Sequence, residues 1–338
     1  MKPVRGSGYG RTKNHMKRWW SIWVIFSVTV LIFSGMAEAQ QKKMISIGTG
    51  GTGGIYYPYG GAVASLITKY VPGVDATAEV TAASGDNCLL LAAGRVQIGF
   101  AGADILWDAY NGKLKGHAQK IPLRTVVVLY PQVTSLITLE GSPIRSVKDL
   151  VGKRLSTGAP NSGTEFKALR ILKANGIDPD KEIKRERLSF VESAGGLKDR
   201  KLDAIFVDGG VPLGSVLDLA ATPGLKIRFI NHGDSHKKMN EEYGPIYYDY
   251  KIPKGTYPGI DESSGVGNAN MLICREDLEE DLAYSITKAL FDHKPDLVRV
   301  HKEAEKLKLE SAVIGSPVPF HKGAARYFAE KKLNVKSE

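Results

Sequence analysis

The chain has 338 residues, of which 43% are hydrophobic and 24% charged, with a formal net charge of +10 and two cysteines. This composition is typical of a folded globular protein, and it excludes a disordered chain or a small disulfide-dense domain. The basic excess alone would suggest a nucleic-acid or membrane partner, so its position along the chain decides what it means.

Much of the basic excess lies in the first 39 residues. Residues 1–18 hold six Lys and Arg and no acid, an apolar run spans 19–35, and Ala-Glu-Ala stands at 37–39. This order predicts a secretory signal peptide cleaved before Gln40, and hence a periplasmic protein. A retained membrane anchor is the alternative, although the apolar run is short for a bilayer span. Removing the segment lowers the net charge from +10 to +5 and leaves no basic block, so no nucleic-acid partner is expected.

Strand-like and helix-like runs alternate through the rest of the chain. We expect early strands at 44–47, 76–81 and 96–101, and helices at 60–70 and 85–93. An irregular stretch at 107–121 and apolar runs at 125–130 and 135–139 follow. The alternation then repeats, with strands expected at 153–156, 187–191 and 203–207 and helices at 163–175 and 193–200. A strand at 268–274 and helices at 277–291 and 295–307 close the chain.

The roughly 299 residues after the signal exceed one typical core and predict two lobes. We expect an α/β fold in which 40–132 and 256–338 form lobe 1, 133–255 forms lobe 2, and the sheets are mainly parallel. Residues 81–104 and 189–210 share one plan, which two lobes of similar architecture would show. Ligands then belong at the carboxyl ends of the strands, in a cleft between the lobes.

The glycine-rich loop at 47–61 contains G-x-G-x-x-G, the fingerprint of a dinucleotide site. Such a site needs an acid at the end of the second strand, where we expect Val-Thr-Ala-Ala at 80–83. The large side chains at 55–58 would also crowd a pyrophosphate. We therefore expect no cofactor. The loop instead predicts backbone N–H groups and aromatic walls around a small ligand.

Two helix starts offer further contacts. Ser84 is the expected N-cap of its helix, and Asn87 lies on the same face, from which we expect it to reach toward the cleft. Ser162 and Glu165 predict a capping box. The same helix start offers free N–H groups, hydroxyls and a positive dipole end, which suit a carboxylate.

The remaining candidates point to binding rather than catalysis. Asp208 with two glycines ends a strand, and either accepts a hydrogen bond from a ligand amino group or fixes a turn. No nucleophile elbow, HExxH motif or Cys/His set is present, so neither an enzyme nor a metal site is predicted. Cys88 and Cys274 sit in apolar context, and either a disulfide or two buried thiols remains open.

Five stretches resemble the solute-binding proteins of tripartite ATP-independent periplasmic (TRAP) transporters, in the TAXI subfamily. They are residues 47–67, 81–104, 142–177, 202–220 and, more weakly, 255–297. The resemblance implies a type II periplasmic-binding-protein fold that closes on a small anionic solute, such as glutamate, glutamine or a dicarboxylate. It also implies delivery to a TRAP membrane permease. From the organisation of the chain we expect hinges near 130–135 and 251–266, and we expect the protein to be a monomer.

The motifs and the resemblance together predict one set of ligand contacts. In lobe 1 they are Thr52, Gly53, Gly54, Tyr56, Tyr57, Ser84, Asn87 and Asp104, and in lobe 2 they are Ser162, Gly163, Thr164, Asp208 and Gly209. Two departures from the family pattern bear on the ligand: Gly85-Asp86 before Asn87, and the aromatic segment after Asp104. Two other functions stay open, a periplasmic sensor that serves a membrane histidine kinase and an NAD-dependent enzyme.

Overall fold

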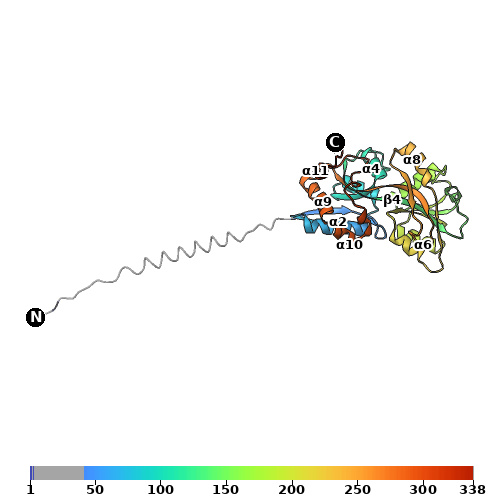
Figure 1. The fold of residues 1–338 in the computed structure, drawn as a ribbon, viewed down its shortest axis with the longest axis horizontal. Helices are drawn as coiled ribbons and strands as arrows, with labels where there is room; N and C mark the ends of the chain where they lie inside the picture. Colours follow the sequence, from blue (N-terminus) through green and yellow to red (C-terminus); the bar gives the residue numbers. More distant parts are fainter. Residues whose placement is uncertain (2, 4–41, 338) are drawn as a thin grey trace. The chain divides into compact units, whose positions relative to one another are not determined.

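The computed structural model describes residues 1, 3 and 42–337. The chain divides into the units Met1–Lys42 and Lys43–Glu338, and the second unit carries the fold (Figure 1). The signal-peptide prediction rests on residues 1–39, nearly all of which lie outside the described part. Within that part, every helix is too short or too polar to span a bilayer.

One mixed sheet of ten strands runs through residues 43–275. Its order is β2-β1-β3-β10-β4-β7-β5-β6, with β8 beside β4 and β9 beside β10. The strands are β1 Lys43–Gly48, β2 Val74–Glu79, β3 Ile98–Gly102, β4 Leu123–Leu139, β5 Arg154–Ser156, β6 Lys184–Glu186, β7 Ala204–Gly209, β8 Ile227–Ile230, β9 Tyr248–Ile252 and β10 Ser263–Arg275.

The helices pack against the strands of this sheet. They are α2 Tyr56–Tyr70, α3 Ser84–Ala92, α4 Ala103–Tyr110, α5 Gly163–Ala174, α6 Phe190–Lys198, α7 Gly214–Ala220, α8 His236–Tyr243, α9 Glu280–Asp292, α10 Lys294–Val300 and α11 Lys322–Glu330. Short 3-10 turns lie at Val147–Leu150, Gly233–Ser235 and Lys302–Lys306. Figure 1 shows α2, α9, α10 and α11 grouped on one side of β4, and α6 and α8 on the other.

The two halves of the sheet repeat one strand order. We call β1–β3 with α2–α4 and α9–α11 the first half, and β5–β9 with α5–α8 the second half. The first half runs β2-β1-β3-β10-β4, and the second runs β6-β5-β7-β4-β8. In each half the first three strands are parallel, while the crossing strand that follows is antiparallel to them. This repetition supports the expectation of two similar lobes, but the expectation of mainly parallel sheets is wrong where β4 and β10 cross.

The long strands β4 and β10 connect the halves. The sequence predicts two apolar runs on either side of Pro131, but the structure has one strand of 17 residues that continues through it. Pro131 pairs with Ala269, and the β4–β10 register shifts directly afterwards, between Asn270 and Met271. Proline cannot donate to the ladder, so an irregularity beside it is the usual accommodation. The centre of the sheet is therefore the place where the chain passes between the halves.

Most predicted elements lie within a few residues of the observed ones, with four differences. The helix expected at 295–307 is wrong beyond Val300, where α10 ends and a short 3-10 turn follows at Lys302–Lys306. Helix α2 begins at Tyr56 rather than at residue 60. Helix α4 occupies Ala103–Tyr110, and so extends into a stretch expected to be irregular. The strand expected at 187–191 is wrong, because Phe190 begins α6 and β6 lies earlier, at Lys184–Glu186. The Ser189 hydroxyl and the Glu192 carboxylate form a capping box there, which outweighs the strand propensity of Phe and Val.

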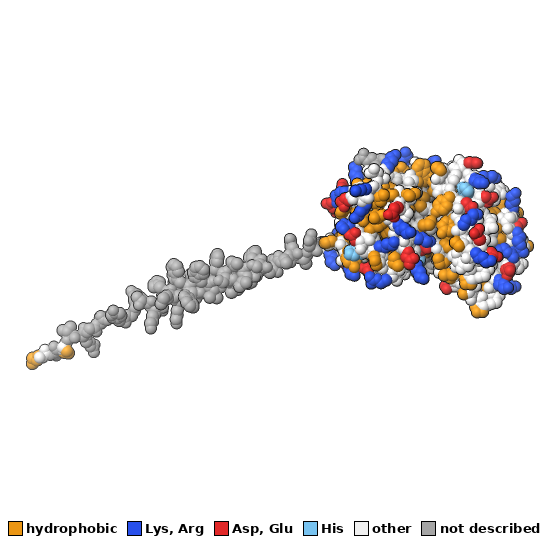
Figure 2. Space-filling model, viewed as in Figure 1, with side chains coloured by type: hydrophobic (Ala, Val, Ile, Leu, Met, Phe, Trp, Pro, Cys, Tyr) orange, Lys and Arg blue, Asp and Glu red, His pale blue; other side chains and the backbone are white. Residues whose placement is uncertain are grey.

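Two hydrophobic clusters hold the layers together. The larger one includes Ile47 and Phe100 of the first half and continues across β4. The smaller one lies in the second half, around Leu155, Ile171 and Phe206. Each side of the central crossing thus has packed apolar residues beneath its strand ends. On the face shown in Figure 2, basic and acidic side chains are interspersed.

Candidate ligand-binding site

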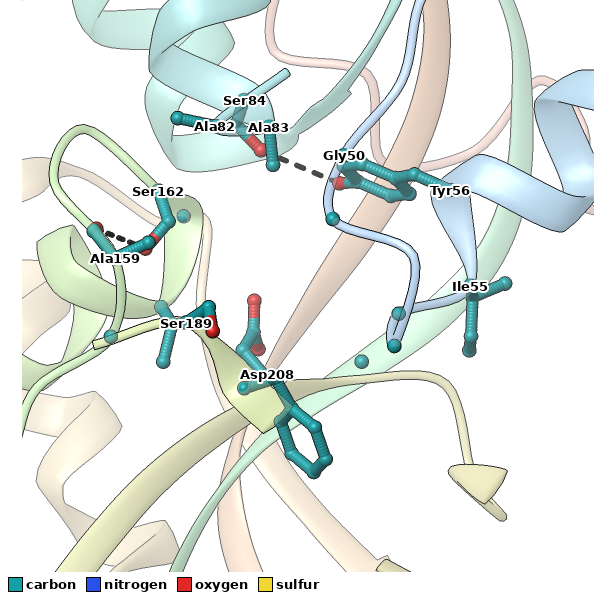
Figure 3. Close-up of a pocket in the computed structure, with 18 of the residues that line it drawn as sticks. Gly50, Ile55, Tyr56, Ala82, Ala83, Ser84, Ala159, Ser162, Ser189 and Asp208 are labelled. Carbon is teal, nitrogen blue, oxygen red and sulfur yellow. Dashed lines mark hydrogen bonds between the residues drawn. The ribbon is translucent and has the colours of Figure 1, made fainter. Parts of the chain in front are cut away.

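A cleft of about 480 Å³ opens at the carboxyl ends of the flanking strands. Its walls come from the segments that follow β1, β2, β5, β6 and β7, and its floor includes Tyr130 and Gln132 of β4. Sites for small organic molecules usually measure about 300–1,000 Å³, so the cleft has an appropriate size. Figure 3 shows the loop from Gly50 to Ile55 facing the segment from Ala159 to Ser162, with Asp208 between them.

The glycine-rich loop forms one wall of the cleft and leads straight into α2. The Tyr56 ring packs on Phe100 with their centroids 5.1 Å apart. Its hydroxyl donates a hydrogen bond to Asn270 Oδ1 and lies 3.4 Å from Ser84 Oγ. Burial raises the pKa of Tyr56 well above its usual value, so the phenol stays protonated. Tyr56 therefore ties the loop to α3 and to the crossing strand β10.

Helix α3 begins one residue differently from the prediction. Ala83 is the N-cap, with a φ of 75°, and Ser84 is the first helical residue. The Ser84 hydroxyl does not cap the helix and instead accepts a hydrogen bond from Gly102 N at 3.2 Å. Expecting Ser84 to be the N-cap is therefore wrong. Ser84 lines the cleft, and because the Tyr56 hydroxyl hydrogen goes to Asn270, the Ser84 hydroxyl is the donor in its 3.4 Å contact with the Tyr56 oxygen.

Helix α5 begins on the opposite wall with the predicted cap. The Ser162 hydroxyl accepts from Glu165 N at 3.1 Å and donates to Ala159 O at 2.7 Å. The Glu165 carboxylate accepts from Asn161 N at 2.8 Å rather than from Ser162 N, so only one arm of the capping box is as expected. Gly163 and Thr164 follow the cap on the lining of the cleft.

Four helices therefore begin at this one cleft: α2, α3, α5 and α6. The first N–H groups of a helix have no intrahelical acceptor, and the helix dipole places partial positive charge there. Neither Lys nor Arg occurs among the residues that line the cleft, and its only charged side chains are Glu192 and Asp208. Glu192 is already engaged, because it accepts from Ser189 N at 2.8 Å. The groups that the cleft could offer to an anion are therefore backbone amides and hydroxyls.

Asp208 is held on the cleft floor by groups from several elements. One of its oxygens lies 2.6 Å from Lys167 Nζ, and the other accepts from Thr134 Oγ1 at 2.9 Å. Lys167 is fully buried and also donates to Asn268 Oδ1 at 3.1 Å. Burial raises the pKa of Asp208 against the opposing effect of Lys167. The pair joins α5 and β7 of the second half to the crossing strands.

A second buried ion pair lies one helical turn further along α5. Arg170 contacts Asp108 of α4 and donates to the Tyr247 hydroxyl at 2.6 Å. That hydroxyl donates to Asp104 Oδ2 at 3.1 Å, and Asn268 Nδ2 donates to Asp104 Oδ1 at 2.8 Å. Burial raises the pKa of Asp108 to about 6 in spite of Arg170. These bonds join the first half to the second beneath the cleft.

Comparison with known proteins identifies the family. A sequence model described as the NMT1-like family matches residues 47–331. The chain belongs to the NMT1-like family. This is the family of TAXI-type TRAP solute-binding proteins, so the resemblance drawn from the motifs is confirmed.

Solved structures similar to this NMT1-like protein are distant in sequence. One is a protein of Bordetella bronchiseptica RB50, with a TM-score of 0.51, 16% identity, and coverage of 88% of this chain and 84% of that one. Another is a Xanthomonas citri protein bound to chloride ion, with a TM-score of 0.51, 11% identity, and coverage of 85% and 95%. A third is the alkanesulfonate-binding protein SsuA from Xanthomonas axonopodis pv. citri, with a TM-score of 0.48, 15% identity, and coverage of 85% and 90%.

Family and fold together give a coarse function. The NMT1-like chain is a solute-binding protein of the type II periplasmic-binding-protein fold that serves a transporter. The family consists of binding proteins rather than enzymes, as the sequence predicts.

The structure places most of the predicted ligand contacts of this NMT1-like protein on the cleft. Those that line it are Thr52, Gly53, Gly54, Tyr56, Ser84, Ser162, Gly163, Thr164, Asp208 and Gly209. Tyr57, Asn87 and Asp104 do not line it. Asn87 is fully buried and donates to Thr49 O and Phe100 O, at 2.7 and 2.8 Å. Asp104 is also fully buried, and it accepts hydrogen bonds from Tyr247 and Asn268. Tyr57 is partly exposed.

Sequence reasoning missed several lining residues. The segment Ser189–Ser193 lines the cleft, and the Ser189-x-x-Glu192 pattern could have revealed it, because it repeats the Ser162-x-x-Glu165 signature. Tyr130 and Gln132 also line the cleft, in a strand without any polar motif. The expectation that the second strand ends without an acid is wrong as well. Strand β2 ends at Glu79, although Glu79 does not line the cleft.

Two other predictions concern metal and sulfur. Among residues 42–337, no group of three or more His, Cys, Asp or Glu side chains is arranged to hold a metal ion. Cys88 and Cys274 are buried free thiols, which resolves the alternative left open by the sequence. Burial raises the pKa of both thiols, so neither is a ready nucleophile.

Proposed function

We propose that this protein captures a small anionic solute in the periplasm through a carboxylate and delivers it, as a monomer without cofactor, to a TRAP permease. The observation that carries the proposal is the convergence of four helix N-termini on one cleft. The glutamate-like, glutamine-like and dicarboxylate solutes implied by the family resemblance are the first candidates. The predicted signal peptide would bring the chain to the periplasm.

Helix N-termini are suited to reversible capture of a carboxylate. A negative charge at one N-terminus is stabilised by about 0.3–1 kcal/mol, and by up to about 2 kcal/mol where the site is partly buried. The first amides of α3 and α5, at Ser84 and Gly163, lie on opposite walls and are fixed by the backbone. They need little reorganisation to meet the solute. Several such weak contacts hold an anion without the desolvation of a buried cation.

Opening and closing of the cleft would follow from the two crossing strands. We propose lobe 1 and lobe 2 on either side of a hinge, with the first boundary between Gln132 and Val133. We propose that the second boundary lies inside β10 rather than near residue 256, because Ser263–Gly267 of β10 pairs with β9 of the second half. Gly85 N donates a hydrogen bond to Asn161 O across the cleft at 3.2 Å. This bond would break when the cleft opens. Such hinge closure is ordinary for paired lobes.

A ligand screen by thermal shift tests this function. Protein lacking the predicted signal peptide is heated with amino acids, dicarboxylates, keto acids or NADH in excess. A true solute raises the unfolding midpoint by mass action. We expect at least one carboxylate to do so and NADH to have no effect. A shift by NADH alone would establish the dinucleotide alternative. The observed strand order 2-1-3 opposes that outcome, because the Rossmann order is 3-2-1-4.

A pair of substitutions tests the helix start directly. Ser162→Ala removes the α5 cap and should lower the free energy of unfolding by about 1 kcal/mol. Thr164→Ala removes a hydroxyl that lines the cleft and has no hydrogen-bond partner in the described chain. The double variant should therefore lose more solute affinity, measured by calorimetry, than apo stability. Equal losses of affinity and stability would assign this helix start to capping alone.

A further inference from the structure

We infer that the solute carries a single carboxylate on an apolar body, and that the cleft selects against a second carboxylate. This inference rests on the proposed function, since it assumes that the cleft of about 480 Å³ binds a carboxylate. It narrows the class of solute, and it differs from the dicarboxylates that the family resemblance suggests.

The two pairs of helix N-termini offer different surroundings. Where α3 meets α5, a Cβ built on Gly163 would lie 3.0 Å from Ser84 Oγ, so the two starts are close together. The Thr164 hydroxyl lines the cleft there and has no side-chain hydrogen-bond partner among the described residues. Where α2 meets α6, a Cβ on Gly53 would lie 2.6 Å from the Val191 side chain. The lining on that side includes Ile55, Phe190 and Val191. The first pair suits a carboxylate, and the second suits an apolar group.

Among the described residues that line the cleft, no Lys or Arg is present to pair with a second carboxylate. Lys167 contacts Asp208 on the floor at 2.6 Å, but it is fully buried and does not line the cleft. The buried layer below holds three acids, Asp104, Asp108 and Asp208, against two bases, Lys167 and Arg170. When all five are ionised, this layer carries an excess negative charge. A dianion would lose the water around its second charge and face a negative field in return.

The rim of the cleft is apolar. Val80 and Val191 line the cleft and are 57% and 59% exposed, and Phe206 and Leu213 lie deeper. Exposed apolar side chains at a cleft mouth gain stability when a ligand covers them. The apolar body of the solute would therefore lie along these side chains, with its carboxylate at α3 and α5.

Chain-matched ligands test the inference. Calorimetry is carried out with monocarboxylates and dicarboxylates of four to eight carbons, with glutamate, and with the alcohols of the same lengths. We expect the best monocarboxylate to bind at least about tenfold more tightly than its dicarboxylate partner, and the alcohols not to bind. Tighter binding of a dicarboxylate or glutamate overturns the inference and leaves the proposed function standing. Binding by none of the carboxylates overturns the proposed function as well.

A charge added at the rim provides a second test. Val191→Lys adds a positive charge at an exposed position of the rim, where it could pair with a second carboxylate. Val80→Lys adds a positive charge to the rim from the first half. Each should shift the affinity ratio toward the dicarboxylate by about fivefold or more. Val300→Lys is the matched control, because Val300 is 55% exposed and does not line the cleft. An unchanged ratio in both rim variants, or an equal shift in the control, overturns the inference.

Discussion

The lining of the cleft and the layer directly beneath it use polar groups in opposite ways. The lining presents backbone amides, hydroxyls and apolar side chains, and neither Lys nor Arg occurs among its described residues. Its two carboxylates, Glu192 and Asp208, already have partners in the protein. The layer beneath concentrates five charged side chains, Asp104, Asp108, Lys167, Arg170 and Asp208, within buried contacts. The groups left unpaired in the lining are thus neutral, while Asp208, which reaches the lining from this layer, is paired with Lys167.

This division has a physical reason. A charged side chain facing the cleft would be hydrated when the cleft is open and would lose that water on closing, at a cost of several kcal/mol. Backbone amides at helix starts carry only partial charge, so removing water from them costs less free energy. Charges that stay buried are desolvated once, during folding. They are suited to joining the halves, as Arg170 of α5 and Asp108 of α4 do.

The largest expected effect follows from breaking a pair in the buried layer. Lys167→Met removes the cation that contacts Asp208 at 2.6 Å and Asn268 at 3.1 Å, and leaves a buried carboxylate uncompensated. We expect the free energy of unfolding in urea to fall by about 3–5 kcal/mol. Adding Asp208→Asn should restore part of the loss, because the unpaired charge is then gone. A loss below about 1 kcal/mol in the single variant would contradict the assignment of Lys167 to the layer.

The pH dependence of Asp108 gives the next effect. Burial raises its pKa from 3.8 to about 6, so the folded protein binds this proton more tightly than the unfolded chain does. The resulting stabilisation is fully present below about pH 4 and is lost as the pH rises to about 6. Relative to Asp108→Asn, the wild type should therefore lose about 2–3 kcal/mol of stability between these pH values, measured by urea unfolding. A parallel pH dependence in the two proteins would rule out this role for Asp108.

The cleft lining was more accessible to sequence reasoning than the layer beneath. Glycine-rich turns and Ser-x-x-Glu caps are local patterns, so the loop at Gly53 and the start of α5 could be predicted. Ser189 was missed because the following Phe190 and Val191 also favour a strand. Local patterns fix where a helix begins, and parallel strands bring those starts to the same edge of the sheet.

The buried layer could not be predicted in the same way. Lys167 and Arg170 belong to one helix, and their partners Asn268 and Asp108 lie 101 and 62 residues away in the chain. Such side chains are normally exposed, and only the packing of α5 against β7, α8 and β4 buries them. Asn87 shows the same limit, because its amide is used by Thr49 O and Phe100 O rather than by the cleft.

The proposed closure of the cleft depends on Gly85, which lies beside the lining residue Ser84. A Cβ on Gly85 would lie 2.6 Å from the backbone oxygen of Asn161 on the opposite wall, so Gly85→Ala opposes closure. We expect solute affinity, measured by calorimetry, to fall about tenfold. Gly61→Ala in α2 is the control, because a Cβ there meets nothing within 4 Å. It should leave affinity unchanged, and equal affinities in the two variants would refute a steric role for Gly85.

The smallest expected effect compares one substitution in both regions. Tyr130 lines the cleft, and its buried hydroxyl lacks a hydrogen-bond partner within the described part of the chain. Tyr247 lies in the charged layer, where its hydroxyl accepts from Arg170 and donates to Asp104. Tyr130→Phe removes an unpaired polar group, so the free energy of unfolding should stay level or rise by up to about 1 kcal/mol. Tyr247→Phe leaves two charged partners short of a bond and should cost about 1–3 kcal/mol in the same urea experiment. Equal changes in the free energy of unfolding would show that the polar groups of the lining and of the layer do not differ in how much their hydrogen bonds stabilise the fold.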